Sequence, residues 1–372
     1  MLAPSFFASV FLRFFESPYN KVVFLSQMKI GNVDLGFRPV VLAPMEDVTD
    51  LPFRALCRKM GAAMVYSEFV SSDALVRMVN KSLAKLEVNA GERPVAIQIY
   101  GKTPEAMADA AKIVVEQAHP DVLDINFGCP VKKVAGKGAG AGLLRNVPLM
   151  LEIARAVVDA VNIPVTAKTR LGWDHDSIIV EQLAEQLQDC GIQALTIHGR
   201  TRSQVYNGVA DWEPIRKVRQ NPRIKIPVIG NGDICSGSDA LRRFNETGVD
   251  AVMVGRATFG RPWIFAEINR ELGKDISELG SIAAGGHEPL SLDWKLDVLE
   301  EEIRQSVERN GPVGGLIHMR RHIAASPLFK GIPDFRPTRI AMLRCESIDA
   351  MLELMEGTRP LLCYGNESTN IT

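Results

Sequence analysis

One short stretch brings together a thiol, an amide and two lysines directly after a predicted strand. Residues 124–130 read Asp-Ile-Asn-Phe-Gly-Cys-Pro, and Lys132 and Lys133 follow them. The apolar residues before this stretch favour a strand, which must end at the proline because proline cannot extend a sheet ladder. Cys129 could act as a chemical reagent beside the amide of Asn126, or it could fill an apolar space, as free cysteines usually do. The other strands must decide between these interpretations.

Eight short apolar runs recur along the chain, and helical patterns separate them. The runs are 40–46, 63–70, 95–101, 122–128, 164–170, 194–200, 227–233 and 251–257. Nearly continuous apolar strands that alternate with helices are typical of parallel β-α units. Eight such units in succession predict an α/β fold, a (β/α)8 TIM barrel. A doubly wound sheet is the competing fold, but it usually shows a glycine-rich first turn, which is absent from this sequence.

The carboxyl ends of the predicted strands carry polar residues or glycines. A TIM barrel holds its active site at these ends, so side chains far apart in sequence should meet there. The residues are Pro44, Met45, Glu46, Gln98, Asn126, Cys129, Lys168, Arg170, His198, Asn231, Gly232, Asp233, Gly255 and Arg256. Each has an ordinary structural explanation alone, but their convergence on one rim indicates a functional site.

Glycine-rich turns follow the seventh and eighth strands, where barrels commonly bind phosphate. These turns are 230–233 and 255–257, and Arg256 can add a charged clamp. Alternatively, the glycines only make tight turns. Lys168 could reach the carbonyls of a ring, and Gln98 could reach the edge of a heterocycle. This set of groups suits a flavin mononucleotide (FMN) whose ring lies beside the fourth strand.

The composition is that of an ordinary globular protein. The 372 residues have a formal net charge of −1, are 46% hydrophobic and include no run long enough for a transmembrane helix. Nucleic acid could therefore bind to a local basic patch but not to a globally positive surface. The absence of a run long enough for a transmembrane helix also means that we expect no membrane association. Six cysteines are scattered without a disulfide or metal-binding spacing, so we expect no metal and a reducing, cytoplasmic location.

The chain divides by pattern into a barrel, a linker and a helical region. Its phenylalanine-rich start is expected to be an extension outside the fold, with translation beginning at Met28. The expected parts are the extension 1–27, the barrel 28–262, a linker 263–290, a small all-α helical domain 291–360 and a flexible tail 361–372. The expected architecture is thus a TIM barrel followed by a small all-α domain.

Basic residues are concentrated in two parts of the chain. Three helices are predicted after the linker, at 292–309, 313–325 and 338–355. The later ones carry a basic stripe that includes Arg320 and Arg321 and could bind RNA. The glycine-rich and lysine-rich segment 132–145 is predicted to be a mobile lid that contacts RNA phosphate. Both features can also be interpreted as solvated surface.

The motifs together resemble the tRNA-dihydrouridine synthases, most closely the bacterial B-type, over residues 30–265. The matching motifs are Ala43-Pro44-Met45, Gln98-Ile99-Tyr100-Gly101, Asp124–Pro130, Lys168-Thr169-Arg170, 196–202, Asn231-Gly232-Asp233 and Gly255-Arg256. Glu46 and Asp47 stand where many members have Ala-Gly, and Gly142 replaces a more usual Ala or Ser. The helical region resembles the family only in architecture and position.

The resemblance implies an oxidoreductase that reduces the C5–C6 double bond of a uridine in the tRNA D-loop to 5,6-dihydrouridine. It implies FMN as cofactor, NADPH as reductant and position 17 as target, and we expect a monomer. The expected flavin contacts are Pro44, Met45, Glu46, Gln98, Lys168, His198, Asn231, Gly232, Asp233, Gly255 and Arg256. With the basic patches added, the expected tRNA contacts are Asn126, Arg170, Lys132, Lys133, Arg200, Arg202, Arg320 and Arg321.

The resemblance makes Cys129 the acid that gives a proton to C5 while hydride from the flavin reaches C6. A thiol with an ordinary pKa of about 8.5 stays mostly protonated at neutral pH and can donate. Lys168 and Arg170 oppose this role, because nearby cations favour the thiolate. The role therefore requires these cations to lie nearer the uracil carbonyls or the flavin than the sulfur.

Three other functions stay open at this point. A flavin barrel could reduce a free pyrimidine, but the basic helical region would then have no role. A non-redox barrel could hold a phosphorylated sugar as an isomerase or lyase, and it would bind no yellow flavin. A non-catalytic tRNA-binding protein or chaperone would keep its RNA affinity without Cys129 or FMN.

Overall fold

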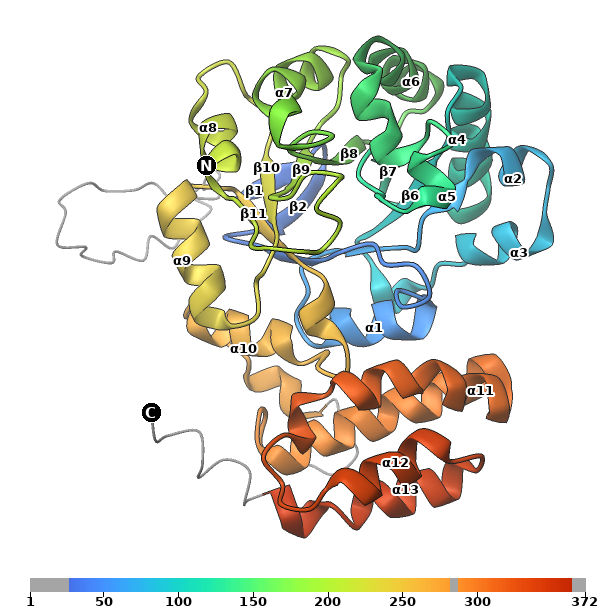
Figure 1. Cartoon of the computed structure of the whole chain (residues 1–372), viewed down its shortest axis with the longest axis vertical. Coiled ribbons are helices and arrows are strands. Elements are labelled where there is room, and N and C mark those ends of the chain that lie inside the picture. The colour runs from blue at the N-terminus through green and yellow to red at the C-terminus, as the bar shows by residue number, and fades with distance from the viewer. Residues whose placement is uncertain (1–26, 282–286, 363–372) are drawn as a thin grey trace, which may run out of the picture.

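The computed structural model describes residues 27–281 and 287–362, and its centre is a ring of eight parallel strands (Figure 1). The strands are β3 (Val40–Leu42), β4 (Val65–Tyr66), β6 (Val95–Tyr100), β7 (Val122–Asn126), β8 (Val165–Arg170), β9 (Leu195–His198), β10 (Val228–Asn231) and β11 (Ala251–Val254). Their order is β3-β11-β10-β9-β8-β7-β6-β4, and a parallel bridge between Val41 and Met64 closes the ring. The predicted TIM barrel is confirmed.

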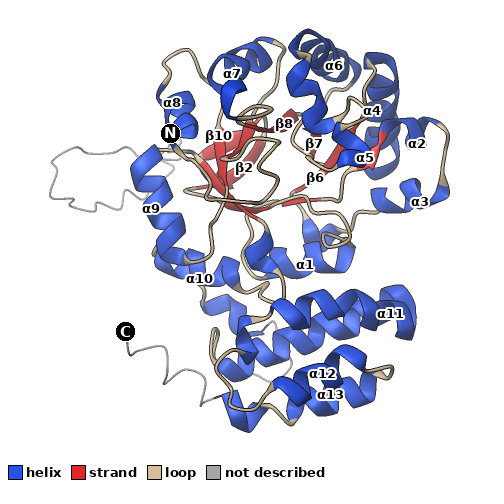
Figure 2. Ribbon diagram, viewed as in Figure 1, coloured by secondary structure: helices blue, strands red, loops and turns tan. Residues whose placement is uncertain are grey.

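Helices surround the strands, as the apolar strand pattern requires (Figure 2). The barrel helices are α1 (Leu51–Lys59), α2 (Ser72–Val76), α3 (Asn80–Leu83), α4 (Pro104–Ala118), α5 (Lys132–Ala135), α6 (Val147–Ala160), α7 (Val180–Asp189), α8 (Glu213–Gln220), α9 (Gly237–Thr247) and α10 (Ile264–Glu271). One predicted strand differs: the run 63–70 forms β4 and a separate short strand, β5 (Val70–Ser71), and both pair with β6.

An antiparallel hairpin that the sequence reasoning missed closes the amino end of the barrel. It consists of β1 (Met28–Ile30) and β2 (Val33–Gly36). Met28, Ile30 and Leu35 are buried against apolar side chains of the barrel interior. The hairpin turn lies over the starts of β8 and β9, since a Cβ on Gly31 would be 2.6 Å from Pro164 Cγ. The expected extension 1–27 lies outside the described residues except for its last position.

The helical region differs from prediction at both of its boundaries. The expected linker 263–290 contains α10, a buried helix that packs on α9 and completes the barrel, so that part of the prediction is wrong. The small-residue segment 282–286 lies outside the described residues. At the other end, the expected tail 361–372 begins too early, because Leu362 is buried. The remaining tail, 363–372, lies outside the described residues.

Three helices make up the region after the barrel. They are α11 (Leu292–Ala325), α12 (Arg336–Arg344) and α13 (Ile348–Glu356). The predicted break between 309 and 313 appears as a kink in α11, where Gly311 has a φ of 74°. The single helix predicted at 338–355 is wrong, because Cys345 is extended (ψ 138°) and separates α12 from α13.

The helical region packs on the barrel beside α1 and α10 (Figure 1). Ser326 Oγ donates a 2.7 Å hydrogen bond to the carbonyl of Gly260, which follows β11. Arg321 Nη1 donates at 2.8 Å to the carbonyl of Asp47, which follows β3. These contacts place α11 next to the carboxyl ends of the strands. Across residues 27–281 and 287–362, no helix combines the length and apolar character needed to span a bilayer.

Candidate active site

A cavity of about 750 Å³ opens at the carboxyl ends of the barrel strands. Its wall draws on the ends of β3, β7, β8, β9, β10 and β11. The predicted site residues on this wall are Pro44, Met45, Glu46, Asn126, Cys129, Lys168, Arg170, His198, Asn231, Gly232, Asp233, Gly255, Arg256 and Arg321. The fold thus brings most of the predicted residues into one cavity, whose volume is typical of a site for a cofactor or small ligand.

A chain of hydrogen bonds inside the barrel fixes the backbone that carries Cys129. Asp124 is fully buried, and its carboxylate accepts 2.6 Å hydrogen bonds from Gln98 Nε2 and Thr166 Oγ1. Gln98 Oε1 accepts from Asn126 Nδ2 at 2.7 Å. Asn126 Oδ1 then accepts from the backbone N–H of Cys129 at 2.8 Å. Because a carboxylate only accepts, Asp124 sets the direction of both amides and so the position of the thiol.

The same chain corrects the expected role of Gln98. Its side chain is completely buried and is absent from the cavity wall, because Asp124 and Asn126 occupy both ends of its amide. Gln98 therefore supports Asn126 instead of meeting the edge of a flavin. Burial raises the pKa of Asp124 to about 6, and the hydrogen bonds from Thr166 and Gln98 limit the rise. Asp124 is thus mostly ionised at neutral pH and stays an acceptor.

Gln98→Leu should break this chain at its centre. The substitution leaves the Asn126 amide and one oxygen of Asp124 without partners inside the barrel, and each such loss costs about 1–3 kcal/mol. We expect a lower melting temperature and a fall of at least about tenfold in the catalytic rate, because Asn126 no longer holds Cys129. The matched control is Thr166→Val, which removes the other hydrogen bond to Asp124 and leaves the path to Cys129 intact. If Gln98→Leu and Thr166→Val lost equal stability and equal catalytic rate, the hydrogen bonds from Asp124 to Cys129 would have a purely structural role.

Cys129 is buried, with 8% of its surface exposed, and it packs in an apolar cluster at the edge of the cavity. The cluster contains Val134 and Ala139, with Phe69 and Tyr100 packed beside them. Burial raises the pKa of the Cys129 thiol above its ordinary value, although a backbone hydrogen bond, Arg170 and Lys168 act in the opposite direction. The thiol therefore stays protonated at neutral pH, as a proton donor requires.

Backbone carbonyls hold the Nε and Nη1 of Arg170 in place. Its Nε donates to the carbonyl of Gly128 at 2.8 Å, and its Nη1 donates to Thr201 and Val205 carbonyls at 2.9 and 2.8 Å. Burial lowers the pKa of Arg170 to about 10. Arg170 thus stays charged on the cavity wall while its donors brace the segment before Cys129.

The segment predicted as a mobile lid is ordered into helical turns. Residues 132–135 form α5, and Gly140–Arg145 form a 3-10 helix. Val134 is buried against Cys129 and Ala135 is also buried, whereas Lys132 and Lys133 are exposed. The close approach explains Gly142, because a Cβ there would lie 2.3 Å from the carbonyl oxygen of Ala135. The segment is a packed cover over the thiol with a helical turn at each end, whereas its mobility and its contact with RNA phosphate stay predictions.

Gly140→Ala should disturb the wall against which Cys129 packs. Gly140 has a φ of +53°, and a Cβ there would lie 3.0 Å from Val134 Cγ1 and 3.2 Å from Cys129 Cβ. The matched control is Gly138→Ala, since Gly138 has a φ of +80° but nothing within 4 Å of its Cβ position. In both variants the left-handed backbone conformation lowers the free energy of unfolding by about 1–2 kcal/mol. Only Gly140→Ala should also change the alkylation rate of Cys129, and equal rates in the two variants would contradict this packing argument.

Lys168 and His198 place one titrating and one neutral group on the cavity wall. Burial and then repulsion by Arg170 lower the pKa of Lys168 to about 7, against the attraction of Asp124. Burial and the surrounding cations hold the pKa of His198 well below its ordinary value, so the imidazole is neutral. Arg200 Nη1 lies 3.3 Å from His198 Nε2, and because arginine can only donate, Nε2 accepts and Nδ1 carries the proton.

Arg200 is a buried support and not a surface contact, which corrects its predicted role toward tRNA. Only 1% of its surface is exposed. Its Nη2 donates to the Gly208 carbonyl at 2.6 Å and to Asp233 Oδ2 at 2.8 Å. Asp233 also pairs with Arg256 Nη2 at 3.0 Å. The sequence could not separate Arg200 from the next arginine, because its burial depends on acceptors far along the chain.

The turns after β10 and β11 bring the backbone of Gly232 and Gly255 to the cavity wall. Gly232 has a φ of +132°, and a Cβ there would lie 2.6 Å from Ala210 Cβ. Gly255 separates β11 from Arg256, whose side chain is half exposed and held by Asp233. A backbone without side chains next to a guanidinium provides the donors that a phosphate group needs.

Three carboxylates lie together beside the entrance, at Glu46, Asp47 and Glu68. Lys85 Nζ lies 2.6 Å from Glu46 and 3.4 Å from Glu68, so the group already has a cation. Burial raises the pKa of Glu46, and the hydrogen bond from Lys85 opposes the rise. The Glu46-Asp47 departure noted in the sequence therefore builds an ion-paired rim, to which Arg321 adds its hydrogen bond with Asp47.

The remaining predicted contacts are spread around the rim. Lys132, Lys133 and Arg320 are exposed, and Arg202 is partly exposed. Sequence reasoning missed Phe69 and Tyr206, which also line the cavity. The ring of Tyr206 is half exposed on a loop, beside the guanidinium groups of Arg170 and Arg256. An aromatic residue in a polar loop was the available signal for it.

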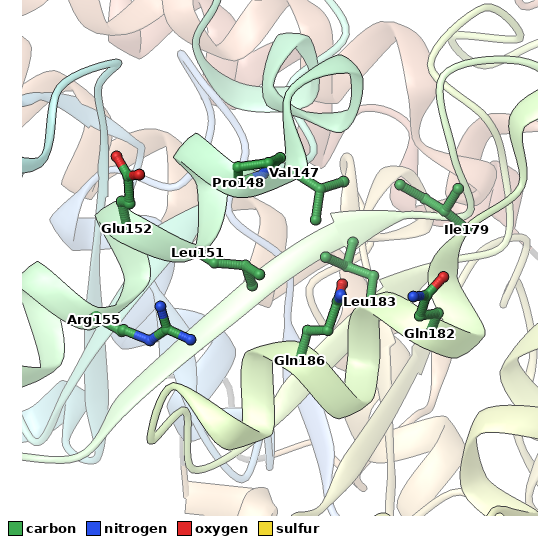
Figure 3. Close-up of a pocket in the computed structure, with 9 residues that line it drawn as sticks. All are labelled: Val147, Pro148, Leu151, Glu152, Arg155, Ile179, Gln182, Leu183 and Gln186. Carbon is green, nitrogen blue, oxygen red and sulfur yellow. The ribbon is translucent and has the colours of Figure 1, made fainter.

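A second hollow, of about 460 Å³, lies outside the barrel between α6 and α7 (Figure 3). Figure 3 shows mixed apolar and polar side chains along two helices. They are Val147, Pro148, Leu151, Glu152, Arg155, Ile179, Gln182, Leu183 and Gln186. None of them belongs to the predicted site. The cavity at the carboxyl ends of the strands is therefore the candidate active site.

Comparisons with solved structures support the barrel fold. Solved structures that share the fold include a 2-naphthoyl-CoA reductase (TM-score 0.52, 11% identity, covering 67% of this chain and 52% of that chain). Histamine dehydrogenase from Rhizobium sp. 4-9 also matches (TM-score 0.52, 11% identity, 82% and 51%). The chain spans about half the length of these proteins. At such low identity they show the fold alone.

Proteins related in sequence are much more similar to this chain than these structures are. tRNA-dihydrouridine synthase B of Pseudomonas aeruginosa is 47% identical over 67% of this chain and 74% of its own. The enzyme of that name from Escherichia coli K12 is 43% identical over 80% and 88%, and that from Xanthomonas axonopodis pv. citri is 40% identical over 88% and 94%. A profile of the dihydrouridine synthase family matches residues 41–353. The chain therefore belongs to the dihydrouridine synthase family of tRNA-modifying oxidoreductases.

Proposed function

We propose that this enzyme reduces the C5–C6 double bond of a D-loop uridine in tRNA, with FMN as cofactor and NADPH as reductant. The observation that carries the proposal is the position of Cys129 on the wall of the cavity, where hydrogen bonds that lead back to Asp124 hold its backbone and burial raises the pKa of its thiol. Family membership supplies the reaction class, and the cavity supplies groups suited to each part of it.

The residues of the cavity fit FMN. Its volume suits a cofactor. The backbone of Gly232 and Gly255, with Arg256, would hold the phosphate, and Lys168 would face the carbonyl side of the ring. When bound and reduced by NADPH, FMN supplies a hydride to C6 of the uracil. Pro44 and Met45 would form the apolar wall at the end of β3.

The protein's own part in the reaction is a proton transfer. Cys129 gives its Sγ proton to C5 on the face opposite the hydride, and the thiolate is reprotonated from solvent. Neutral His198 and the cation Arg170 can hydrogen-bond the uracil carbonyls, where negative charge develops. The packed cover of α5 keeps bulk water away from the sulfur, and this preserves the raised pKa of the thiol.

The uridine must leave its stack to enter the cavity, so the enzyme must also grip the tRNA around it. Cations around the cavity whose side chains are exposed or partly exposed are suited to hold the RNA backbone. They are Lys132, Lys133 and Arg202 on the barrel, and Arg320 with Arg321 on α11. Arg321 reaches the cavity wall itself, so the helical region is close enough to share in binding.

Purified protein, FMN and unmodified tRNA test the proposal directly. We expect a yellow protein that forms dihydrouridine with NADPH, measured by mass spectrometry of digested tRNA, with position 17 as the mapped target. Parallel reactions contain NADH, or free uridine and uracil in place of tRNA. Reduction of the free pyrimidines but not of tRNA would favour the alternative reductase. Absence of flavin binding would exclude both the proposed function and the alternative reductase.

A further inference from the structure

Two arginines share one tryptophan beside the cavity. Trp173 lies in the turn after β8, and its ring centroid is 5.0 Å from Arg145 Cζ and 4.5 Å from Arg202 Cζ. Arg145 ends the cover over Cys129, and Arg202 lies in the loop after β9. We call these three residues the Trp173 cluster. None of the three belongs to the wall of the cavity, so the flavin site does not explain them.

The cluster is preformed and its charge is unmatched. The Arg202 backbone N–H donates to the Gly172 carbonyl at 2.9 Å, which ties the two loops together. In the described parts of the chain, neither guanidinium has an ion pair, and Arg202 Nε is buried without a hydrogen-bond partner. The arginines of α8 and α9 behave differently, because each has a carboxylate within 3.2 Å. They are Arg216, Arg219, Arg242 and Arg243.

Two guanidinium groups lie against one ring, and their N–H donors have no acidic partner among the residues that the structure describes. Such an arrangement is suited to bind an anion. The indole face stabilises each guanidinium by a cation–π contact and reduces the conformational entropy that binding would otherwise cost. Planar guanidinium groups bind phosphate with paired hydrogen bonds. The Trp173 cluster therefore has the chemistry of a phosphate site.

The cluster lies across the cavity from the helical region. In the closed order of strands, β8 is four positions from β3 in either direction, so the two strands face each other across the ring. The helical region meets the barrel after β3, where Arg321 bonds Asp47, whereas Trp173 follows β8. A polyanion held at both places would pass over the mouth of the cavity.

We propose that the Trp173 cluster binds backbone phosphates of tRNA next to the uridine that is reduced. The inference rests on the proposed function and extends its RNA surface to residues 145 and 173. The phosphates of NADPH have the same chemistry, so the experiment must separate the two sources. A position on the outer rim, away from the cavity wall, favours the RNA.

The test compares Arg145→Ala/Arg202→Ala with Arg223→Ala/Lys225→Ala, which removes two exposed cations before β10, at the other end of the barrel. tRNA affinity is measured at several salt concentrations, together with flavin absorbance and the KM for NADPH. For the first variant we expect at least about tenfold weaker binding and a salt slope reduced by about two, with flavin retained. The second should bind nearly as the unaltered protein does.

Two further variants keep the test decisive if the alanine variant folds poorly. Arg145→Lys/Arg202→Lys and Trp173→Leu retain both charges, so they should keep the salt slope but bind tRNA more weakly. Unchanged affinity in all of these variants would overturn the inference, and so would a raised KM for NADPH with normal tRNA binding. Dihydrouridine formation by the unaltered protein is a separate measurement, so failure of the cluster and failure of the proposed function are distinguishable.

Discussion

Cys129→Ala should lose dihydrouridine formation by about 100- to 10,000-fold, the range in which a positioned general acid contributes to a rate. The thiol is the proposed proton donor on the cavity wall, and alanine leaves the rest of the wall in place. The variant should still bind the yellow cofactor and oxidise NADPH, because neither step needs the proton. Mass spectrometry of tRNA and the absorbance of the flavin separate these outcomes.

Two control variants sharpen this result. Cys129→Ser keeps the shape and a weaker acid, so it should be slow but measurably better than alanine. Cys345→Ala removes a thiol between α12 and α13, far along the chain from the cavity, and should leave the rate unchanged. A normal dihydrouridine yield from Cys129→Ala would remove the cysteine from the mechanism.

The dependence of the catalytic rate on pH in the unaltered enzyme should reflect the pKa of the buried Cys129 thiol. Because burial raises the pKa of Cys129, the acid form persists above the pH at which an exposed cysteine ionises. Activity that depends on this proton is therefore full at neutral pH and falls as the pH rises through the raised pKa. This decline should be missing from the residual rate of Cys129→Ser.

Strand positions could be predicted from the sequence, because each barrel strand is an apolar run followed by a polar or glycine residue. That pattern alone predicts Lys168, His198 and Asn231 on one wall, and the cavity contains all three. Burial of polar side chains could not be predicted in the same way. Gln98 and Arg200 occupy strand ends too, but long-range acceptors hold them behind the wall.

The cover over Cys129 shows another limit of local patterns. Four glycines among lysines suggested a flexible loop, yet two of them, Gly140 and Gly142, are needed for close approach of the backbone to its neighbours. Similarly, the Trp173 cluster joins three segments that no spacing rule connects. A sequence reports which residue types follow each strand, whereas their contacts depend on how neighbouring loops pack.

Lys168→Met should lower the midpoint potential of bound FMN by about 30–60 mV, equivalent to a 10- to 100-fold loss in relative affinity for the two-electron reduced form. Reduction adds negative charge to the flavin ring, and Lys168 is the cavity cation expected to face it. Methionine keeps a similar length and the apolar packing but removes the charge. Spectroscopic titration against a reference dye measures the potential, and an unchanged value would show that Lys168 does not face the ring.

The pH dependence of that potential identifies the charge responsible. In the free protein, burial and Arg170 hold the pKa of Lys168 at about 7, and an anionic ring beside it must raise that pKa. The extra stability of the reduced complex is therefore fully present below pH 7 and is lost as the pH rises through the raised value. Between these pH values, reduction of the unaltered protein takes up one proton more than reduction of Lys168→Met. Asp124 titrates lower, at about 6, and His198 stays neutral, so neither interferes in this window. If the midpoint potentials of the two proteins changed with pH by the same amount above pH 7, the effect would belong to another group.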